Sequence, residues 1–137
     1  MKVLQFAFGA GPVDPFLPHN YDSPQWVVYT GTHDNDTVIG WYEESSTEAE
    51  RDYARKDMGT GARDISWDLI RLGWASVADT AMTTTQDLLG LGHEARMNTP
   101  STLGPPNWCW RMQAGALTDE VADRLLTMTA IYGRLPG

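Results

Sequence analysis

Three short runs of apolar or β-branched residues along the chain are typical of buried β-strands. They cover residues 3–8, 26–32 and 80–86. The second run, which begins "WVVYT", is apolar on both faces at its start, as parallel strands covered by helices usually are. Glycine and proline follow the first run and end it. Because segments of helical pattern separate the later runs, we expect an α/β fold with a parallel sheet.

The segment that begins at Thr47 has the pattern of a charged surface helix. Thr47 and Glu50 have the spacing of a capping box, and the good helix formers "EAERDYARKDM" follow. We expect the charges of this helix to face solvent, and we assign them no function.

Two further segments predict helices with apolar stripes. The first has Ile65, Leu69 and Leu72 on one face and further apolar residues beside them, so it should pack against a sheet. The second runs over residues 118–132 and ends at Gly133. Its predicted stripe consists of Val121, Leu125, Met128 and Tyr132. A Pro/Gly-rich loop over residues 98–107 precedes this last helix.

Polar side chains gather where two of the predicted strands end. His33 and Asp34 follow the second strand, and Gln86 and Asp87 lie at the end of the third. Parallel strands bring such residues to one shared edge, where α/β proteins place their chemistry. A carboxylate there could stabilise positive charge on a sugar ring while an imidazole binds its hydroxyls. A loop histidine with a turn-forming aspartate, or simple helix capping, explains the same residues equally well.

Composition excludes several classes of partner. The 137 residues suit one domain or a piece of one, and 18 acidic residues against 10 Lys and Arg give a net charge of −8. Such a charge disfavours nucleic acid and anionic membrane surfaces. We find no apolar run of membrane-spanning length, and the N-terminal segment does not have the pattern of a signal peptide. The lone Cys109 suggests a buried thiol in a reducing, cytoplasmic compartment.

Two longer motifs are specific in combination, namely "GTHDNDT" and "QDLLGLGHEARMNTP". They occur together with "MKVLQFAF", "LIRLGWASVADTA" and "NWCWRM". With these motifs, nearly the whole chain resembles the C-terminal part of the 4-α-glucanotransferases of the amylomaltase, or disproportionating enzyme, family. One departure is "TPSTLGPPNW", in which Ser101 stands where the family usually has glycine.

This resemblance implies the fold and the roles of individual residues. Residues 1–137 would form a partial catalytic (β/α)8 barrel domain, a TIM barrel, with the three runs as about strands six to eight. Asp34 would be the transition-state stabiliser of a retaining reaction that moves α-1,4-glucan segments between maltooligosaccharides or to glucose. The residues implied to bind substrate are His33, Asn35, Gln86, Asp87 and Asn98. No cofactor and no metal are implied.

The resemblance also implies that essential groups lie upstream of this chain. In the family, the nucleophile and the acid/base precede "MKVLQFAF". Retaining transfer requires both groups. We therefore expect a fragment that is inactive alone, with an α-glucan substrate and the N-terminal part of the barrel as partners.

Two other functions are consistent with parts of the pattern. A metal-dependent hydrolase could use His33, Asp34 and Asp36, with His19 or His93 as a further ligand. A non-catalytic carbohydrate-binding module could retain half of a sugar cleft.

Several remaining residues have competing roles. Trp67 and Trp74 are expected in the core. For Trp108 and Trp110 the pattern does not decide between core packing and stacking on a sugar ring. Arg96 could orient the site, although an ion pair with Glu94 or Asp87 is the commoner role for such an arginine. His19 is expected to be held by neighbouring backbone.

Overall fold

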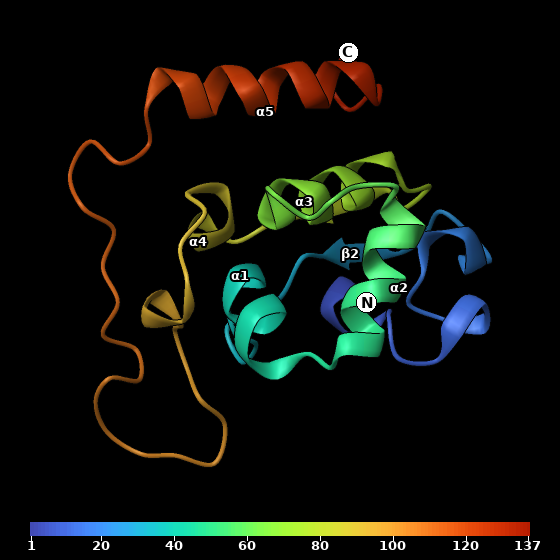
Figure 1. The fold of residues 1–137 in the computed structure, drawn as a ribbon. Coiled ribbons are helices and arrows are strands. Elements are labelled where there is room, and N and C mark those ends of the chain that lie inside the picture. Colours follow the sequence, from blue (N-terminus) through green and yellow to red (C-terminus); the bar gives the residue numbers. More distant parts are fainter.

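A three-stranded parallel sheet forms the centre of the protein, seen in a computed structural model that describes all of residues 1–137 (Figure 1). The strands are β1 (Lys2–Val3), β2 (Val27–Tyr29) and β3 (Thr80–Met82), in the order β1-β2-β3. Both neighbours of β2 run parallel to it. The predicted α/β fold with a parallel sheet is therefore confirmed at this level.

The strands are shorter than their apolar runs predict. After Val3 the chain turns into the 3-10 helix η1 (Leu4–Phe6), where the Gln5 side chain donates to the buried carbonyl of Asp36 over 2.9 Å. After β3, Thr84 caps the short helix α4 (Thr85–Leu88) by accepting from the Asp87 amide. The expected end of the third strand therefore lies in a helical turn.

The predicted helices are present with the expected ends. They are α2 (Glu48–Met58), which has the full Thr47–Glu50 capping box, α3 (Ile65–Ala75) and α5 (Asp119–Ile131). Gly133 follows α5 with φ 66°, a left-handed conformation that suits glycine. The shorter helical turns are η2 (Gly11–Val13), η3 (Pro18–Asn20), α1 (Val38–Gly40), η4 (Trp41–Ser45) and η5 (His93–Ala95).

Helix α3 lies between the sheet and α5 (Figure 1). On one side, Leu69 joins the main core with Leu4 and Val28. On the other side, a smaller core of Trp67, Ile70 and Trp74 receives the stripe of α5, which contains Val121, Leu125, Met128 and Tyr132. The predicted stripe and the predicted core positions of both tryptophans are thus confirmed.

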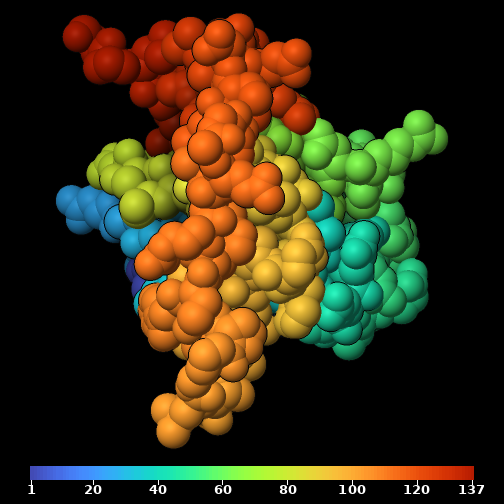
Figure 2. Space-filling view, turned by 90° about the vertical axis from the view of Figure 1, so that its left-hand side faces the viewer, coloured from blue at the N-terminus to red at the C-terminus, as the bar shows by residue number.

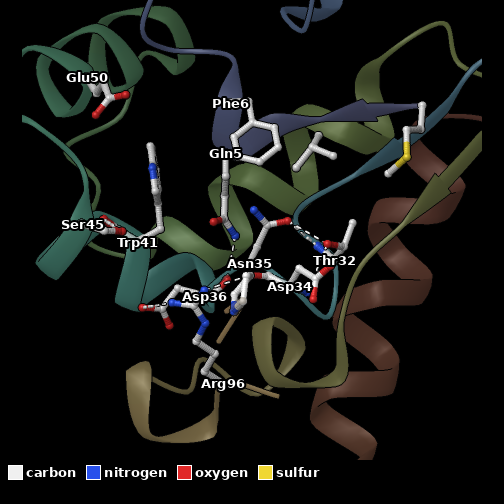
Figure 3. Close-up of a pocket in the computed structure, with 13 residues that line it drawn as sticks. Gln5, Phe6, Thr32, Asp34, Asn35, Asp36, Trp41, Ser45, Glu50 and Arg96 are labelled. Atoms are coloured by element: carbon white, nitrogen blue, oxygen red, sulfur yellow. Dashed lines mark hydrogen bonds and ion pairs between the residues drawn. The ribbon is translucent and has the colours of Figure 1, made fainter. Parts of the chain in front are cut away.

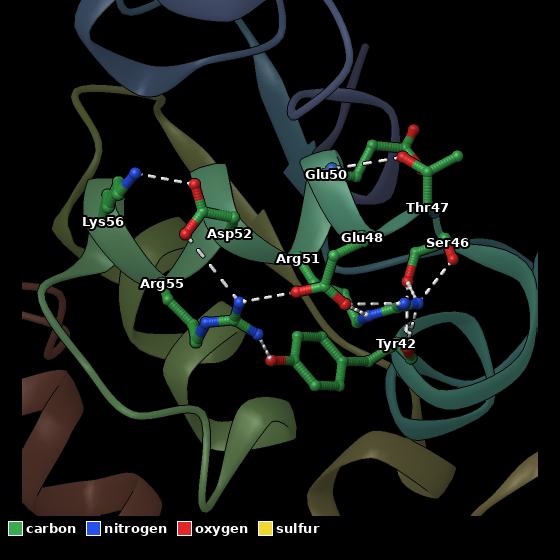
Figure 4. A network of polar contacts seen from close by, with 9 residues as sticks. All are labelled: Tyr42, Ser46, Thr47, Glu48, Glu50, Arg51, Asp52, Arg55 and Lys56. Carbon is green, nitrogen blue, oxygen red and sulfur yellow. Dashed lines mark hydrogen bonds and ion pairs between the residues drawn. The ribbon is translucent and has the colours of Figure 1, made fainter.

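Helix α2 is fixed to the turn η4 by a polar network (Figure 4). Arg55 donates to Tyr42 Oη over 2.6 Å, and Arg51 donates to the Ser46 carbonyl over 2.6 Å. Glu48 accepts from both arginines, and these hydrogen bonds hold its pKa below the usual range. Arg51 and Arg55 thus hold α2 against the segment that follows β2.

Residues 98–117 contain no helix or strand and form an extended segment between η5 and α5 (Figure 1). Figure 2 shows this segment crossing one face of the molecule and projecting beyond it. Cys109 lies on it and is exposed, so the predicted buried thiol is wrong. None of the helices combines the length and apolar composition needed to span a membrane.

Candidate functional site

The turn that follows β2 is braced from inside by Asn35. Its Oδ1 accepts from the backbone amide of Thr32 over 2.9 Å and from the Thr32 hydroxyl over 3.0 Å. The Thr32 hydroxyl in turn accepts from the Asp34 amide. These bonds fix a tight turn in which the Asn35 side chain is engaged by Thr32. A contact of Asn35 with substrate remains a prediction.

Asp34 projects from this turn with a side chain that is 53% exposed. The Asn98 side-chain amide donates to its Oδ1 over 2.8 Å, and His33 Nε2 lies 3.3 Å from its Oδ2. Arg96 donates to the Asp34 carbonyl over 2.9 Å. The structure therefore brings together His33, Asp34 and Asn98, which the resemblance names as site residues, and their roles in catalysis and binding stay predictions.

Two open clefts meet at this turn. The larger, of about 680 Å³, is lined by Asp34 together with Gln5, Phe6 and Trp41 (Figure 3). The smaller, of about 300 Å³, is lined by His33 and residues that follow β3. The carboxylate and the imidazole thus face adjoining spaces, which suits a ligand longer than one ring.

Asp87 lies inside the fold, where its side chain contacts the segment after β2 and helix α1. It accepts from the Thr30 hydroxyl and from the Val38 amide, each over 2.8 Å, and only 1% of the residue is exposed. Burial raises the pKa of its carboxyl group. This geometry favours a structural role, and a substrate contact for Asp87 remains an untested prediction.

Gln86 is also buried, and its side-chain amide donates to the Ala95 carbonyl over 3.1 Å. It lines the smaller cleft, as His33 does. A contact of Gln86 with sugar stays a prediction, and its position in the lining of the cleft is compatible with it.

Arg96 contacts the turn after β2. Its Nε donates to the Asn98 carbonyl over 2.8 Å, and its Nη1 lies 3.9 Å from Asp36 Oδ2. The ion pair expected with Glu94 or Asp87 is absent, because the guanidinium points toward the turn.

The loop histidine outside the site has the expected role. His19 Nε2 donates to the carbonyl of Pro12 over 2.8 Å, so neighbouring backbone holds the ring as the sequence predicts.

His93 and Asp36 form a hydrogen-bonded pair, whereas the sequence named both only as possible ligands of a metal. His93 Nδ1 donates to Asp36 Oδ2 over 2.6 Å, and the Asp36 side chain is 5% exposed. The hydrogen bond to Asp36 raises the pKa of His93. Because 57 positions separate the two residues, no local pattern could have paired them.

Trp108 lies against His33, with ring centroids 5.2 Å apart. The residue is 56% exposed, so burial does not account for its position. Its backbone has φ 61°, which is strained for a bulky residue, and its amide donates to the Met97 carbonyl over 2.7 Å. A strained backbone that holds an exposed aromatic ring beside polar groups is typical of a binding surface.

The metal-dependent alternative would require several ligands to converge. The structure brings together no group of three or more His, Cys, Asp or Glu side chains in a metal-binding arrangement. Asp36 is instead engaged by His93 and by the Thr37 amide.

Comparison with known proteins finds similar sequences along nearly the whole chain. The family model described as 4-alpha-glucanotransferase matches residues 1–118. The chain is 47% identical over 135 residues to the 4-alpha-glucanotransferase of Clostridium butyricum, covering 98% of this chain and 27% of that protein. It is 48% identical over 140 residues to a chloroplastic/amyloplastic 4-alpha-glucanotransferase of Arabidopsis thaliana, covering 98% of this chain and 24% of that protein.

A solved structure has the same fold over this region. The amylomaltase from Streptococcus agalactiae, in complex with acarbose, has a TM-score of 0.91 and 36% identity. The match covers 99% of this chain and 27% of the amylomaltase. The chain thus spans about a quarter of the length of these relatives, and the expectation that it matches only part of the family's length is confirmed.

Proposed function

Since this chain belongs to the 4-alpha-glucanotransferase family, we propose that it contributes one part of a catalytic domain that transfers α-1,4-glucan segments between maltooligosaccharides or to glucose. The single observation that carries the proposal is the Asp34 carboxylate, which is held by Asn98 and open to the larger cleft. Cytoplasmic location stays a prediction, because the Arabidopsis relative is described as chloroplastic/amyloplastic.

The sheet topology supports a place within a barrel. Strands β1 and β3 each pair on one side only. In a closed parallel barrel every strand has two neighbours and helices cover the outside. Residues 1–137 would then supply strands six to eight of a (β/α)8 barrel, and the remaining strands would be the partner of both open edges.

Asp34 is proposed to act as the transition-state stabiliser. Glycosyl transfer passes through a transition state in which positive charge develops on the sugar ring. A carboxylate already fixed by hydrogen bonds stabilises that charge without reorganising. Asn98 fixes one oxygen of Asp34, and Arg96 fixes its backbone.

The two remaining catalytic groups are proposed to come from the partner strands. Retaining transfer requires a nucleophile and a proton donor as well as the stabiliser. The 137-residue chain alone should therefore bind sugar without catalysing transfer.

His33 and Trp108 are proposed to bind the sugar next to the scissile bond. The imidazole can hydrogen-bond hydroxyl groups, and the exposed indole can cover the apolar face of a ring. Their ring centroids lie 5.2 Å apart, and His33 lines the smaller cleft together with Gln86.

A titration of maltoheptaose into the 137-residue chain, followed by amide NMR, tests this proposal. We expect the largest shifts at His33, Asp34 and Asn98. The isosteric Asp34→Asn variant should keep the fold and bind more weakly. Shifts confined to residues away from the turn after β2 would contradict the proposal.

A further inference from the structure

The carboxylate of Asp36 lies next to the turn that carries Asp34 and is held by two hydrogen bonds. Its Oδ1 accepts from the Thr37 amide over 2.8 Å, and its Oδ2 accepts from His93 Nδ1 over 2.6 Å. A Cβ at Gly40 would clash with Oδ1, so the small residue at that position leaves room for the carboxylate. Asp36 is therefore held in one place by its neighbours, and His93 provides the side-chain hydrogen bond.

A continuous set of polar contacts leads from this pair to Asp34. Arg96 Nη1 lies 3.9 Å from Asp36 Oδ2, and Arg96 Nη2 donates to the Asp34 carbonyl over 2.9 Å. Arg96 Nε donates to the Asn98 carbonyl, and the Asn98 side chain reaches Asp34 Oδ1. Both the backbone and the carboxylate of Asp34 therefore depend on the position of Arg96.

We propose that His93 is a positioning residue for Asp34, acting through Asp36 and Arg96. His93 lies on η5, only three positions before Arg96, whereas Asp36 lies in the segment that follows β2. The contact thus joins the two segments that build the site. This inference rests on the proposed function, because it concerns the orientation of the carboxylate assigned there.

The charges around His93 determine the sign of its pH dependence. The groups that face it are Asp36, Glu44 of η4 with Oε2 at 3.8 Å, and Arg96. The Asp36 hydrogen bond raises the pKa of His93 above its usual 6.5, and Arg96 opposes that shift. The full ion pair is therefore present below about pH 6.5 and becomes a neutral hydrogen bond as pH rises through the raised pKa.

Two variants separate the donor from the charge. His93→Asn places an amide donor near the position of Nδ1 and cannot titrate, whereas His93→Leu removes the donor. The wild-type affinity for maltoheptaose should fall several-fold from about pH 5.5 to about pH 8.5, whereas the Asn variant should show no such change. The Leu variant should bind about tenfold more weakly throughout, as for the loss of one hydrogen bond to a charged group.

A second readout does not depend on sugar binding. The side-chain amide resonances of Asn98 in the free chain report whether its bond to Asp34 is formed. We expect these resonances to titrate together with His93 in the wild type, to be independent of pH in the Asn variant and to move toward solvent values in the Leu variant. This readout applies even if the chain binds no maltoheptaose, an outcome that would contradict the proposed function alone.

The inference is overturned if the Asn98 resonances of the wild type are independent of pH while His93 titrates. A folded Leu variant with wild-type Asn98 resonances would overturn it as well. If the Leu variant fails to fold, the wild type and the Asn variant still decide the matter.

Discussion

The side-chain amide of Asn98 donates to Asp34 Oδ1 over 2.8 Å across 64 positions of the sequence. This bond joins the turn after β2 to the extended segment that follows η5. It gives the carboxylate one fixed oxygen while the side chain stays half exposed at the larger cleft. The site is therefore assembled from two distant segments, and its function should be sensitive to the contact between them.

Removing the amide of Asn98 should impair sugar binding and leave the fold unchanged. Asn98→Ala loses the bond that orients Asp34, so we expect maltoheptaose affinity to fall about tenfold, as for the loss of one hydrogen bond to a charged group. Because Asn98 lies near the surface, the midpoint of urea unfolding should stay nearly constant.

Asn20→Ala is the matched control for this prediction. The Asn20 amide donates to the carbonyls of Pro12 and Asp14, and it lies outside both clefts. Its variant should bind maltoheptaose like the wild type. Equal losses of affinity in the two variants would show that the Asn98 contact has no specific effect.

Replacing Trp108 should weaken binding with little effect on stability. Its indole is more than half exposed beside His33, so Trp108→Ala removes a stacking surface and not a core side chain. An aromatic contact contributes about 0.5–1.5 kcal/mol beyond burial, which predicts an affinity loss of about three- to tenfold. Calorimetry with maltoheptaose measures this, and Trp108→Phe should retain most of the affinity.

Trp110→Ala provides the control for Trp108. Trp110 lines a different hollow, with Leu89, Leu91 and Ala116. If removal of Trp110 weakens binding as much as removal of Trp108, the stacking role is refuted.

Replacing Asp87 should affect stability. Asp87→Ala leaves the Val38 amide without its acceptor and leaves the Thr30 hydroxyl only the Thr83 hydroxyl at 3.1 Å, and a buried donor left unpaired costs about 1–3 kcal/mol. Asp87→Asn keeps one acceptor oxygen and should destabilise less. Urea denaturation at neutral pH measures both changes, and an alanine variant as stable as the wild type would contradict the structural role.

The pH dependence of stability gives a separate test of Asp87. Burial raises its pKa, so the folded state holds a proton that the unfolded state releases at lower pH. Its contribution to the free energy of unfolding should therefore fall as pH rises from about 3.8 through the raised value. The Asp87→Asn variant should lack this loss, and identical pH profiles for the two proteins would count against a raised pKa.

The helices could be predicted because their determinants are local. The capping box of Thr47 and Glu50, the Thr118 cap and the stop at Gly133 all lie within one turn of the helix end that they define. The α5 stripe follows from helical periodicity alone. The strand ends could not be predicted in this way, since the early end of β1 coincides with a Gln5 contact to a carbonyl 31 positions away.

The site was predictable only in part. The motif around Asp34 predicted that the segment after the second strand belongs to the site. The resemblance named Asn98 for the same site, and its side chain contacts Asp34. The pairing of His93 with Asp36 and the burial of Asp87 depend on packing between distant segments. The exposure of Cys109 likewise depends on the course of residues 98–117 over the surface, which has no periodic pattern.

Disproportionation of maltotriose by a chimera tests the role of Asp34 most directly. In the chimera, residues 1–137 replace the matching quarter of the Clostridium butyricum 4-alpha-glucanotransferase. We expect it to release glucose, the Asp34→Asn chimera to be slower by about a thousandfold or more, and the exposed-site control Asp79→Asn to be unchanged. An Asp34→Asn chimera that releases glucose at the rate of its parent would contradict the role proposed for Asp34.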